Sequence, residues 1–233
     1  MDILRTLLLA GTAGTVFAAL LTSLPIRFGS RLALGAIIGV WIAVAIDAVA
    51  LGALKASPLA LPLLFALPLA AAGLVAASSA GRAAMMAIPV QLIVALNAMR
   101  VIGVFMLLAA LTGSMSGPFP YSAGIGDIIT GLFALPIARV AARTPRDIRV
   151  LEWNIFGALD LIAAVLLGMM SANGSPLQIF HSGTGSALMT TLPWAFIPLV
   201  LVPTYLIGHA IVFAHARAAA TVGRSPRTRF ARA

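Results

Sequence analysis

The chain has 233 residues, of which 61% are hydrophobic and only 9% are charged. Soluble domains are roughly a quarter charged, so this composition excludes a soluble globular domain. The net charge of +9 would suit a nucleic-acid partner only on a soluble module with a basic face, which this chain lacks, so we expect no nucleic-acid binding. The sequence contains no cysteine, which excludes disulfides and thiolate metal sites.

Apolar runs long enough to span a bilayer follow one another along the chain. A hydrocarbon core about 30 Å thick requires roughly 20 apolar residues per helix. The seven runs that meet this requirement are residues 3–25, 32–54, 59–80, 86–113, 123–139, 150–170 and 192–215. Arg27 and Arg31 follow the first run, whereas a signal peptide carries its positive charge in front, so we interpret this run as a retained helix. The sequence predicts an all-α, polytopic membrane protein: a seven-helix bundle over 1–217 and a basic cytoplasmic tail over 218–233.

The positive charges predict how the bundle is oriented. Twelve of the 15 Lys and Arg residues fall in alternate gaps between the runs or in the C-terminal tail. Cytoplasmic loops of membrane proteins carry such an excess. We therefore expect these gaps and the C-terminus in the cytoplasm and the N-terminus outside, in the inner (plasma) membrane of a bacterium. Membrane lipids are the expected surroundings. The sequence leaves open whether the protein forms a homo-oligomer or joins a partner in a membrane complex.

A faint internal repetition links the two halves of the chain. Pro25 precedes Asp47 by 22 residues, and Pro136 precedes Asp160 by 24. A duplication would give two parallel three-helix units joined by the fourth helix, a 3+1+3 plan. An Ala-Gly pair and a Leu-Pro pair also precede each aspartate, at residues 10–11 and 24–25 in the first half and 123–124 and 135–136 in the second. Chance is the other interpretation, because such pairs recur easily in so Leu- and Ala-rich a chain.

The 3+1+3 plan, with the N-terminus outside, resembles that of SWEET-type sugar transporters and, more loosely, of the seven-helix rhodopsins. The resemblance is one of architecture. The chain has no Pro-Gln pair of the kind the sugar transporters carry, and Lys55, its single lysine, lies in an outer gap instead of the seventh helix, where a retinal Schiff base would form. No functional residue is therefore carried over from either family.

Charged side chains inside the predicted spans are the main functional candidates, because each costs at least about 2.5–3.5 kcal/mol at the centre of a bilayer. They are Asp47, Arg100, Asp127 and Asp160. The helical rise of 1.5 Å per residue places all four in the middle and outer half of the bundle. They predict either a polar pocket that opens outward or a structural ion pair that makes burial of Arg100 tolerable.

Two further side chains complete the predicted site. Asn97 lies three residues before Arg100, and Trp153 lies seven before Asp160, so each shares a helix face with its charged neighbour. Asn154 is rotated off that face. The predicted substrate-binding residues are Asp47, Asn97, Arg100, Asp127, Trp153 and Asp160.

The histidines suggest no cofactor, and the glycines in the runs have a structural interpretation. His181 and His209 lie toward opposite sides of the membrane and cannot easily share one metal or haem, so we expect neither. The glycines Gly124, Gly126 and Gly131 are expected to let helices approach closely.

These observations favour a small-molecule transporter or ligand-binding protein whose central site uses Arg100 with Asp47 and Asp160, whereas Asp127 is the carboxylate that we most expect to be merely solvated. One alternative is a membrane-embedded enzyme that acts on a lipid or isoprenoid-like substrate, with an aspartate as general acid or base. A second alternative is an accessory subunit of a larger membrane complex, which requires no site.

Overall fold

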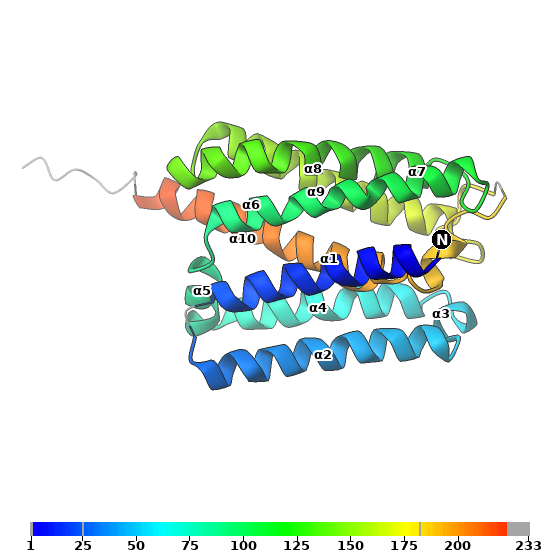
Figure 1. The fold of residues 1–233 in the computed structure, drawn as a ribbon, viewed down its shortest axis with the longest axis horizontal. Coiled ribbons are helices and arrows are strands. Elements are labelled where there is room, and N and C mark those ends of the chain that lie inside the picture. The colour runs from blue at the N-terminus through cyan, green and yellow to red at the C-terminus, as the bar shows by residue number, and fades with distance from the viewer. Residues whose placement is uncertain (1, 25, 182, 223–233) are drawn as a thin grey trace, which may run out of the picture.

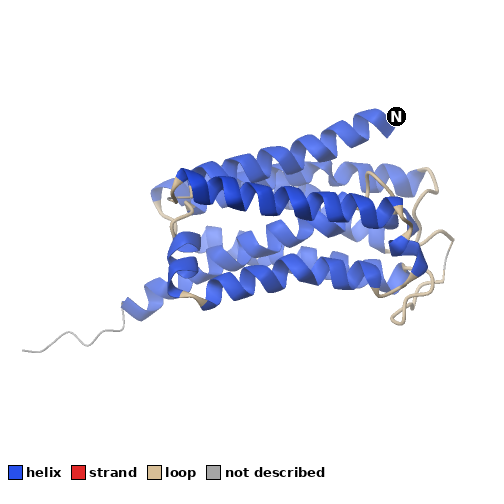
Figure 2. Ribbon diagram, turned by 90° about the horizontal axis from the view of Figure 1, so that it is seen from below, coloured by secondary structure: helices blue, strands red, loops and turns tan. Residues whose placement is uncertain are grey.

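The protein is a bundle of helices that run along one common axis (Figures 1 and 2). The computed structural model describes residues 2–24, 26–181 and 183–222, and these residues form helices and connections without a β-strand. The elements are α1 (Asp2–Ser23), α2 (Phe28–Ala50), α3 (Ala53–Ala56), α4 (Ala60–Ala77), α5 (Ser79–Met86), α6 (Val90–Leu96), the 3₁₀ segment η1 (Asn97–Gly103), α7 (Val104–Leu111), α8 (Phe119–Arg143), α9 (Ile148–Ser171), the 3₁₀ turn η2 (Ala187–Thr190), the π-helical turn η3 (Ile197–Leu201) and α10 (Val202–Val222).

Six helices of the described residues are long and apolar enough to cross a membrane. They are Phe28–Ala50, Ala60–Ala77, Val90–Leu111, Phe119–Arg143, Ile148–Ser171 and Ile197–Ala218. They correspond to the second to seventh predicted runs, with ends shifted by a few residues. The first predicted run forms α1. In α1, the apolar stretch identified among the described residues is Gly14–Ser23, which is shorter than a full span. The seventh span and the repeat therefore stay predictions, and most of the predicted tail lies outside the described residues.

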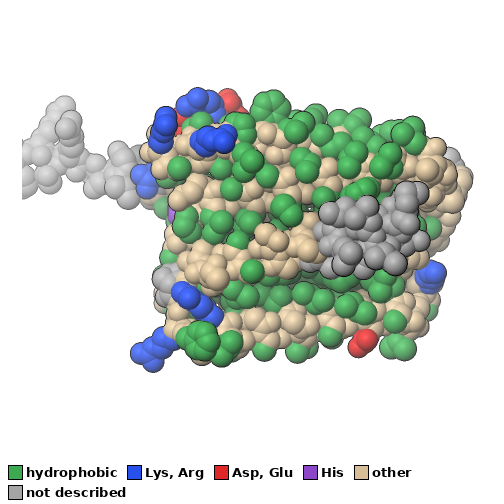
Figure 3. All heavy atoms as spheres, in the orientation of Figure 1, with side chains coloured by type: hydrophobic (Ala, Val, Ile, Leu, Met, Phe, Trp, Pro, Cys, Tyr) green, Lys and Arg blue, Asp and Glu red, His purple; other side chains and the backbone are tan. Residues whose placement is uncertain are grey.

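The two ends of the bundle differ in charge. At one end, called here the arginine end, lie the α1–α2 connection, α5, the α8–α9 connection and the end of α10 (Figure 1). At the other end, called here the loop end, lie α3 and residues 112–118 and 172–191. Lys and Arg side chains gather at the arginine end (Figure 3).

Between the ends, the side chains on the face shown in Figure 3 are mainly apolar. Leu63, Leu74, Leu132 and Leu159 each expose more than half of their surface. A soluble monomer rarely exposes apolar surface on this scale, whereas helices in lipid do so because they satisfy their own backbone hydrogen bonds. The fold is therefore that of a membrane-embedded helical protein.

Close packing of α8 against η1 and α9 forms the centre of the bundle. A β-carbon built at Gly131 would lie 2.8 Å from the backbone nitrogen of Val101, and one at Gly124 would lie 2.9 Å from the carbonyl oxygen of Gly103. No real β-carbon makes such a contact with backbone. The prediction that these glycines permit close helix approach is confirmed.

α10 packs against α9, α6 and α4, and so connects the α6–α9 layer with the layer that contains α4 (Figure 1). Apolar residues of α9, η3 and α10, among them Leu161, Leu199 and Tyr205, form one core cluster with side chains of α2 and α4. η1 interrupts α-helical geometry near the middle of the span Val90–Leu111, and the π-helical turn η3 begins the span Ile197–Ala218. Long 3₁₀ stretches and π-turns inside helices often occur at functional sites.

Candidate functional site

Arg100 lies at the centre of the bundle, on the 3₁₀ segment η1. Only 1% of its side chain is exposed, which makes it a fully buried cation in the middle of a span. η1 packs against α8, and α8 packs against α9, so that acceptors from both helices lie within reach of Arg100. A guanidinium presents five N–H donors in a fixed planar fork, so it can hold several helices in one arrangement.

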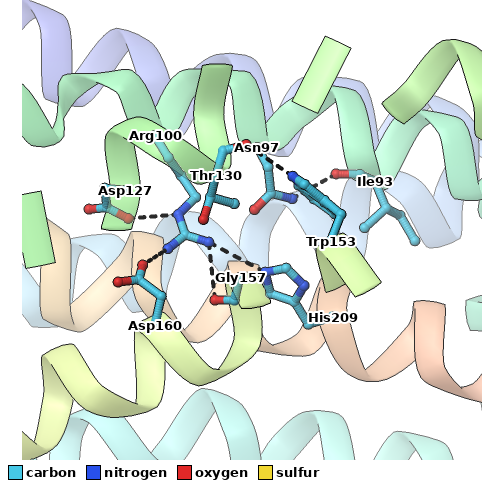
Figure 4. Close-up of polar contacts among 9 residues, drawn as sticks. All are labelled: Ile93, Asn97, Arg100, Asp127, Thr130, Trp153, Gly157, Asp160 and His209. Atoms are coloured by element: carbon cyan, nitrogen blue, oxygen red, sulfur yellow. Dashed lines mark hydrogen bonds and ion pairs between the residues drawn. The ribbon is translucent and has the colours of Figure 1, made fainter. Parts of the chain in front are cut away.

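Two carboxylates share the guanidinium. Arg100 Nε donates to Asp127 Oδ1 at 2.6 Å, and Arg100 Nη2 donates to Asp160 Oδ2. The side chains of Asp127 and Asp160 are 17% and 8% exposed. Figure 4 shows both carboxylates on one side of the guanidinium. Residues predicted from three separate helices therefore form one ion cluster, called here the Arg100 cluster.

The remaining Arg100 donors point to the other side (Figure 4). Nη1 lies 3.3 Å from the carbonyl oxygen of Gly157 and 3.4 Å from His209 Nε2. The guanidinium carbon also lies 5.9 Å from the centre of the Tyr205 ring, within the range of a cation–π contact. Each of the three guanidinium nitrogens thus has a partner in the protein.

His209 and Asn154 form a reciprocal pair between α10 and α9. Asn154 Nδ2 donates to the carbonyl oxygen of His209 at 3.2 Å, which fixes the amide so that its Oδ1 faces His209 Nδ1 at 2.8 Å. Nδ1 must then donate its proton to Oδ1, so Nε2 of the neutral imidazole is an acceptor. This tautomer suits the contact from Arg100 Nη1, and one chain of contacts runs from Asn154 to the ion cluster.

Trp153 and Asn97 extend this polar region toward the arginine end. Trp153 Nε1 donates to the carbonyl oxygen of Thr130 at 3.1 Å, and its ring lies 5.5 Å from that of His209. Asn97 Nδ2 donates back to the carbonyl oxygen of Ile93 at 2.9 Å. Asn97 Oδ1, Thr130 Oγ1 and Tyr205 Oη are buried and have no hydrogen-bond partner in the protein. Buried polar atoms are rarely left without one, so these three atoms keep unused hydrogen-bonding capacity inside the bundle.

A cavity of about 740 Å³ lies on the loop-end side of the cluster. It is enclosed by α3, the first half of α4, α7, the first turns of α8, the second half of α9 and the loop over residues 172–191. Its walls are mainly apolar, with Phe65, Met106, Phe119 and Leu161 among them. Asp127 lines this cavity and also binds Arg100, so the ion cluster forms part of the cavity floor.

One protein family matches the chain. The model of the family described as a domain of unknown function, DUF8737, matches residues 63–217, more than half of the chain. The chain belongs to the DUF8737 family. No curated protein and no solved structure matches it. The matched residues include the whole Arg100 cluster of this DUF8737 protein, with His209 and Asn154, but they exclude Asp47 and Lys55.

The predicted site residues are only partly brought together in this DUF8737 protein. Asp127 and Asp160 each contact Arg100, whereas the sequence favoured Asp47 and Asp160 as its partners and a solvated Asp127. Asn97 and Trp153 lie in the adjoining polar region and contact backbone carbonyls instead of the carboxylates. Asp47 is exposed on α2, and no ion pair with the Arg100 cluster occurs among the described residues. The position of Asp47 along α2 gives it a suitable depth, but its side chain is not on the inward face of the helix.

Sequence analysis considered His209 and Asn154 but left both out of the predicted site. Asn154 is rotated off the face that Trp153 shares with Asp160. However, α8 and α10 contact α9 on two sides, so Trp153 and Asn154 are both buried. The signal available in the sequence was the spacing of four between Tyr205 and His209, which places two polar side chains on one face of the last span.

The cluster has unequal charges. One guanidinium meets two carboxylates, so with both carboxylates ionised the group carries a net negative charge in a nearly water-free region. A buried charge requires a partner or a proton, because low dielectric makes an isolated ion expensive. The arrangement can therefore accept a proton, or a donor group of a ligand, at the face of Asp127 that meets the cavity.

Proposed function

We propose that this protein binds a small, largely apolar molecule in the cavity above the Arg100 cluster and carries it across the membrane. In this proposal Asp127 meets a hydrogen-bond-donating or cationic group of the molecule. The arginine end faces the cytoplasm, in line with the charge asymmetry of membrane proteins, so the cavity opens outside, the N-terminus lies outside and the C-terminus lies inside.

The single observation that carries the proposal is the double role of Asp127. It lines a cavity of about 740 Å³ and it is a member of the buried ion cluster. Binding sites for small molecules typically enclose 300–1,000 Å³, are mainly apolar and contain a few placed polar groups. This cavity has the size and the lining of such a site.

The contacts of Arg100 indicate the chemistry of the ligand. Since its guanidinium nitrogens already have protein partners, Arg100 is a poor anchor for an anionic ligand. Asp127 is instead the charged group that meets the cavity, and a carboxylate accepts hydrogen bonds. The donor group of the ligand would offset the excess negative charge of the cluster.

Helical segments of irregular geometry beside the cavity support transport over static binding. η1 carries Arg100, and η3 contributes Ile197 and Pro198 to the cavity wall. Transporters commonly place their substrate sites at interrupted helices near the middle of the membrane. A 3₁₀ stretch in the middle of a helix, such as η1, often marks a hinge.

The first test asks whether the cavity holds a molecule. Full-length protein is purified from membranes, extracted with organic solvent and analysed by mass spectrometry. Leu61→Trp fills the cavity from α4, whereas Leu63→Trp, on the lipid-facing side of the same helix, is the matched control. An apolar small molecule should be enriched with wild type and Leu63→Trp and lost from Leu61→Trp. Identical extracts from all three would contradict the proposal.

The second test separates transport from catalysis. The molecule recovered in the first test is added to one side of proteoliposomes that contain wild type or Asp127→Asn. Transport predicts that wild type delivers it chemically unchanged to the other side and that Asp127→Asn is slower. Recovery of an altered molecule would favour the enzyme alternative, and co-purification of a partner protein with no ligand would favour the accessory subunit.

A further inference from the structure

Lys55 is the charged residue at the mouth of the cavity. It lies on α3 at the loop end and is exposed, and it lines the same cavity as Asp127. The loop-end segments 51–59, 112–118 and 172–191 contain no other Lys or Arg and no Asp or Glu. Among the described residues Lys55 forms no ion pair. Among the described residues that line the cavity, Lys55 at the mouth is thus a cation outside any ion pair and Asp127 at the floor is a carboxylate.

The wall between these two charges is apolar. Phe119, Ala123 and Asp127 follow one another at intervals of four residues down α8, so they lie on one helix face. The eight residues from Phe119 to Asp127 span about 12 Å at the helical rise. Apolar residues of α4 and α9, such as Phe65 and Val165, face the same space. Hydroxyl side chains of the loop, such as Ser175 and Thr184, join Lys55 at the mouth.

We propose that the ligand is an amphiphile whose anionic head group is held by Lys55, whose apolar body fills the cavity, and whose far end donates a hydrogen bond to Asp127. The inference rests on the proposed function and names the substrate class of that same site. An anionic head at the mouth keeps its charge near water and beside a cation, where it avoids the desolvation cost of the interior. A ligand with its anion at the floor would instead meet the carboxylate of Asp127.

Two probes of equal chain length test this inference. ω-Hydroxydodecanoate carries a carboxylate at one end and a hydroxyl at the other, and dodecane-α,ω-diol replaces the carboxylate by a second hydroxyl. Binding of both to the full-length protein is measured by calorimetry in nanodiscs of uncharged lipid, with empty nanodiscs subtracted. Variants are Lys55→Gln and Lys55→Arg, with Leu61→Trp to fill the cavity and Leu63→Trp as its control.

The expected result is that wild type binds the hydroxy acid about fivefold more tightly than the diol, as for a partly solvated ion pair. Lys55→Arg and Leu63→Trp should keep this ratio, Lys55→Gln should reduce it to about one, and added salt should reduce it in wild type. Leu61→Trp should abolish binding of both probes.

Three other results have separate meanings. Equal binding of both probes that Leu61→Trp abolishes overturns the assignment of Lys55 and leaves the proposed function standing. A preference for the acid that survives in Lys55→Gln, or that Leu61→Trp does not affect, also overturns the assignment, because the anion then binds elsewhere. Binding of neither probe overturns the inference together with the ligand chemistry of the proposed function.

Discussion

Gly126 on α8 lies directly against the carboxylate of Asp160 on α9. A β-carbon built at Gly126 would lie 1.6 Å from Asp160 Oδ1 and 2.3 Å from its carboxyl carbon. The absence of a side chain at position 126 thus gives Asp160 the space from which it reaches Arg100 Nη2. One backbone position on α8 controls whether the second carboxylate can join the Arg100 cluster.

Gly126→Ala should therefore disrupt the cluster. The added methyl group would displace Asp160 from Arg100 or separate α8 from α9, and such overpacking costs about 1–3 kcal/mol. Gly39→Ala is the matched control, because a β-carbon there meets nothing within 4 Å and Ala favours helix over Gly. Thermal unfolding in detergent, followed by size-exclusion chromatography, should show a lower midpoint for Gly126→Ala alone. Equal midpoints for both variants would mean that Asp160 does not occupy this position.

Arg100→Leu should be strongly destabilising, because it leaves two buried carboxylates without a cation. Breaking a buried ion pair from one side typically costs about 3–5 kcal/mol. Arg149→Leu is the comparison, since Arg149 is largely exposed and pairs with Asp147 at the surface, and it should change stability little.

The triple variant Arg100→Leu/Asp127→Asn/Asp160→Asn distinguishes charge from packing. Removal of the two carboxylate charges should recover much of the stability that Arg100→Leu loses, as measured by the same thermal assay. If the triple variant were less stable than Arg100→Leu alone, the loss would come from packing and not from unpaired charge.

The pair of Asn154 and His209 should behave as one energetic unit. Asn154→Leu leaves the Nδ1 proton of His209 without an acceptor, a loss of about 1–3 kcal/mol. His209→Leu should cause a loss of similar size. In a double-mutant cycle, the two losses should add to more than the loss of the double variant, with a coupling of about 0.5–3 kcal/mol. Simple additivity would show that the two side chains do not contact each other.

Acid should affect one ion pair at the arginine end. Hydrogen bonds from Arg149 to Asp147 lower the pKa of the Asp147 carboxyl from 3.8 to about 2. Because the folded value lies below the unfolded one, the stabilisation is present above about pH 3.8 and is lost as pH falls through about 2. A carbon NMR titration should place the Asp147 midpoint near 2, and Arg149→Gln should move it upward. An unchanged midpoint in Arg149→Gln would contradict the pairing.

Composition and charge were enough to predict the membrane-embedded helical fold. The six described spans follow the predicted runs because a bilayer requires long apolar helices and little else from each segment. Residue counting placed the four charged residues in the middle and outer half of the bundle, but it favoured Asp47 over Asp127 as a partner of Arg100, and the structure has Asp127 and Asp160 there. Depth along a helix is readable from residue counting.

The direction in which a side chain points was less readable. Asp47 has a suitable depth but faces outward on α2, because in lipid an apolar face gives no signal of which side is buried. The cavity itself depends on the separation between α4 and the α7–α9 layer and on the loop over residues 172–191, which no local pattern encodes. Asn154 and His209 were left out of the predicted site for the same reason, since their contact depends on how α10 packs against α9.

The central claim, a cavity that opens at the loop end and descends to the Arg100 cluster, can be tested by cysteine accessibility, because the chain has no native cysteine. Ala123→Cys lies on the cavity wall, and Ala134→Cys lies buried on the same helix away from the cavity. Ser114→Cys and Thr144→Cys report the loop end and the arginine end. In oriented membranes, a membrane-impermeant maleimide should label Ala123→Cys from the side that labels Ser114→Cys and should leave Ala134→Cys unlabelled. Labelling of Ala123→Cys only from the side that labels Thr144→Cys, or not at all, would contradict the account.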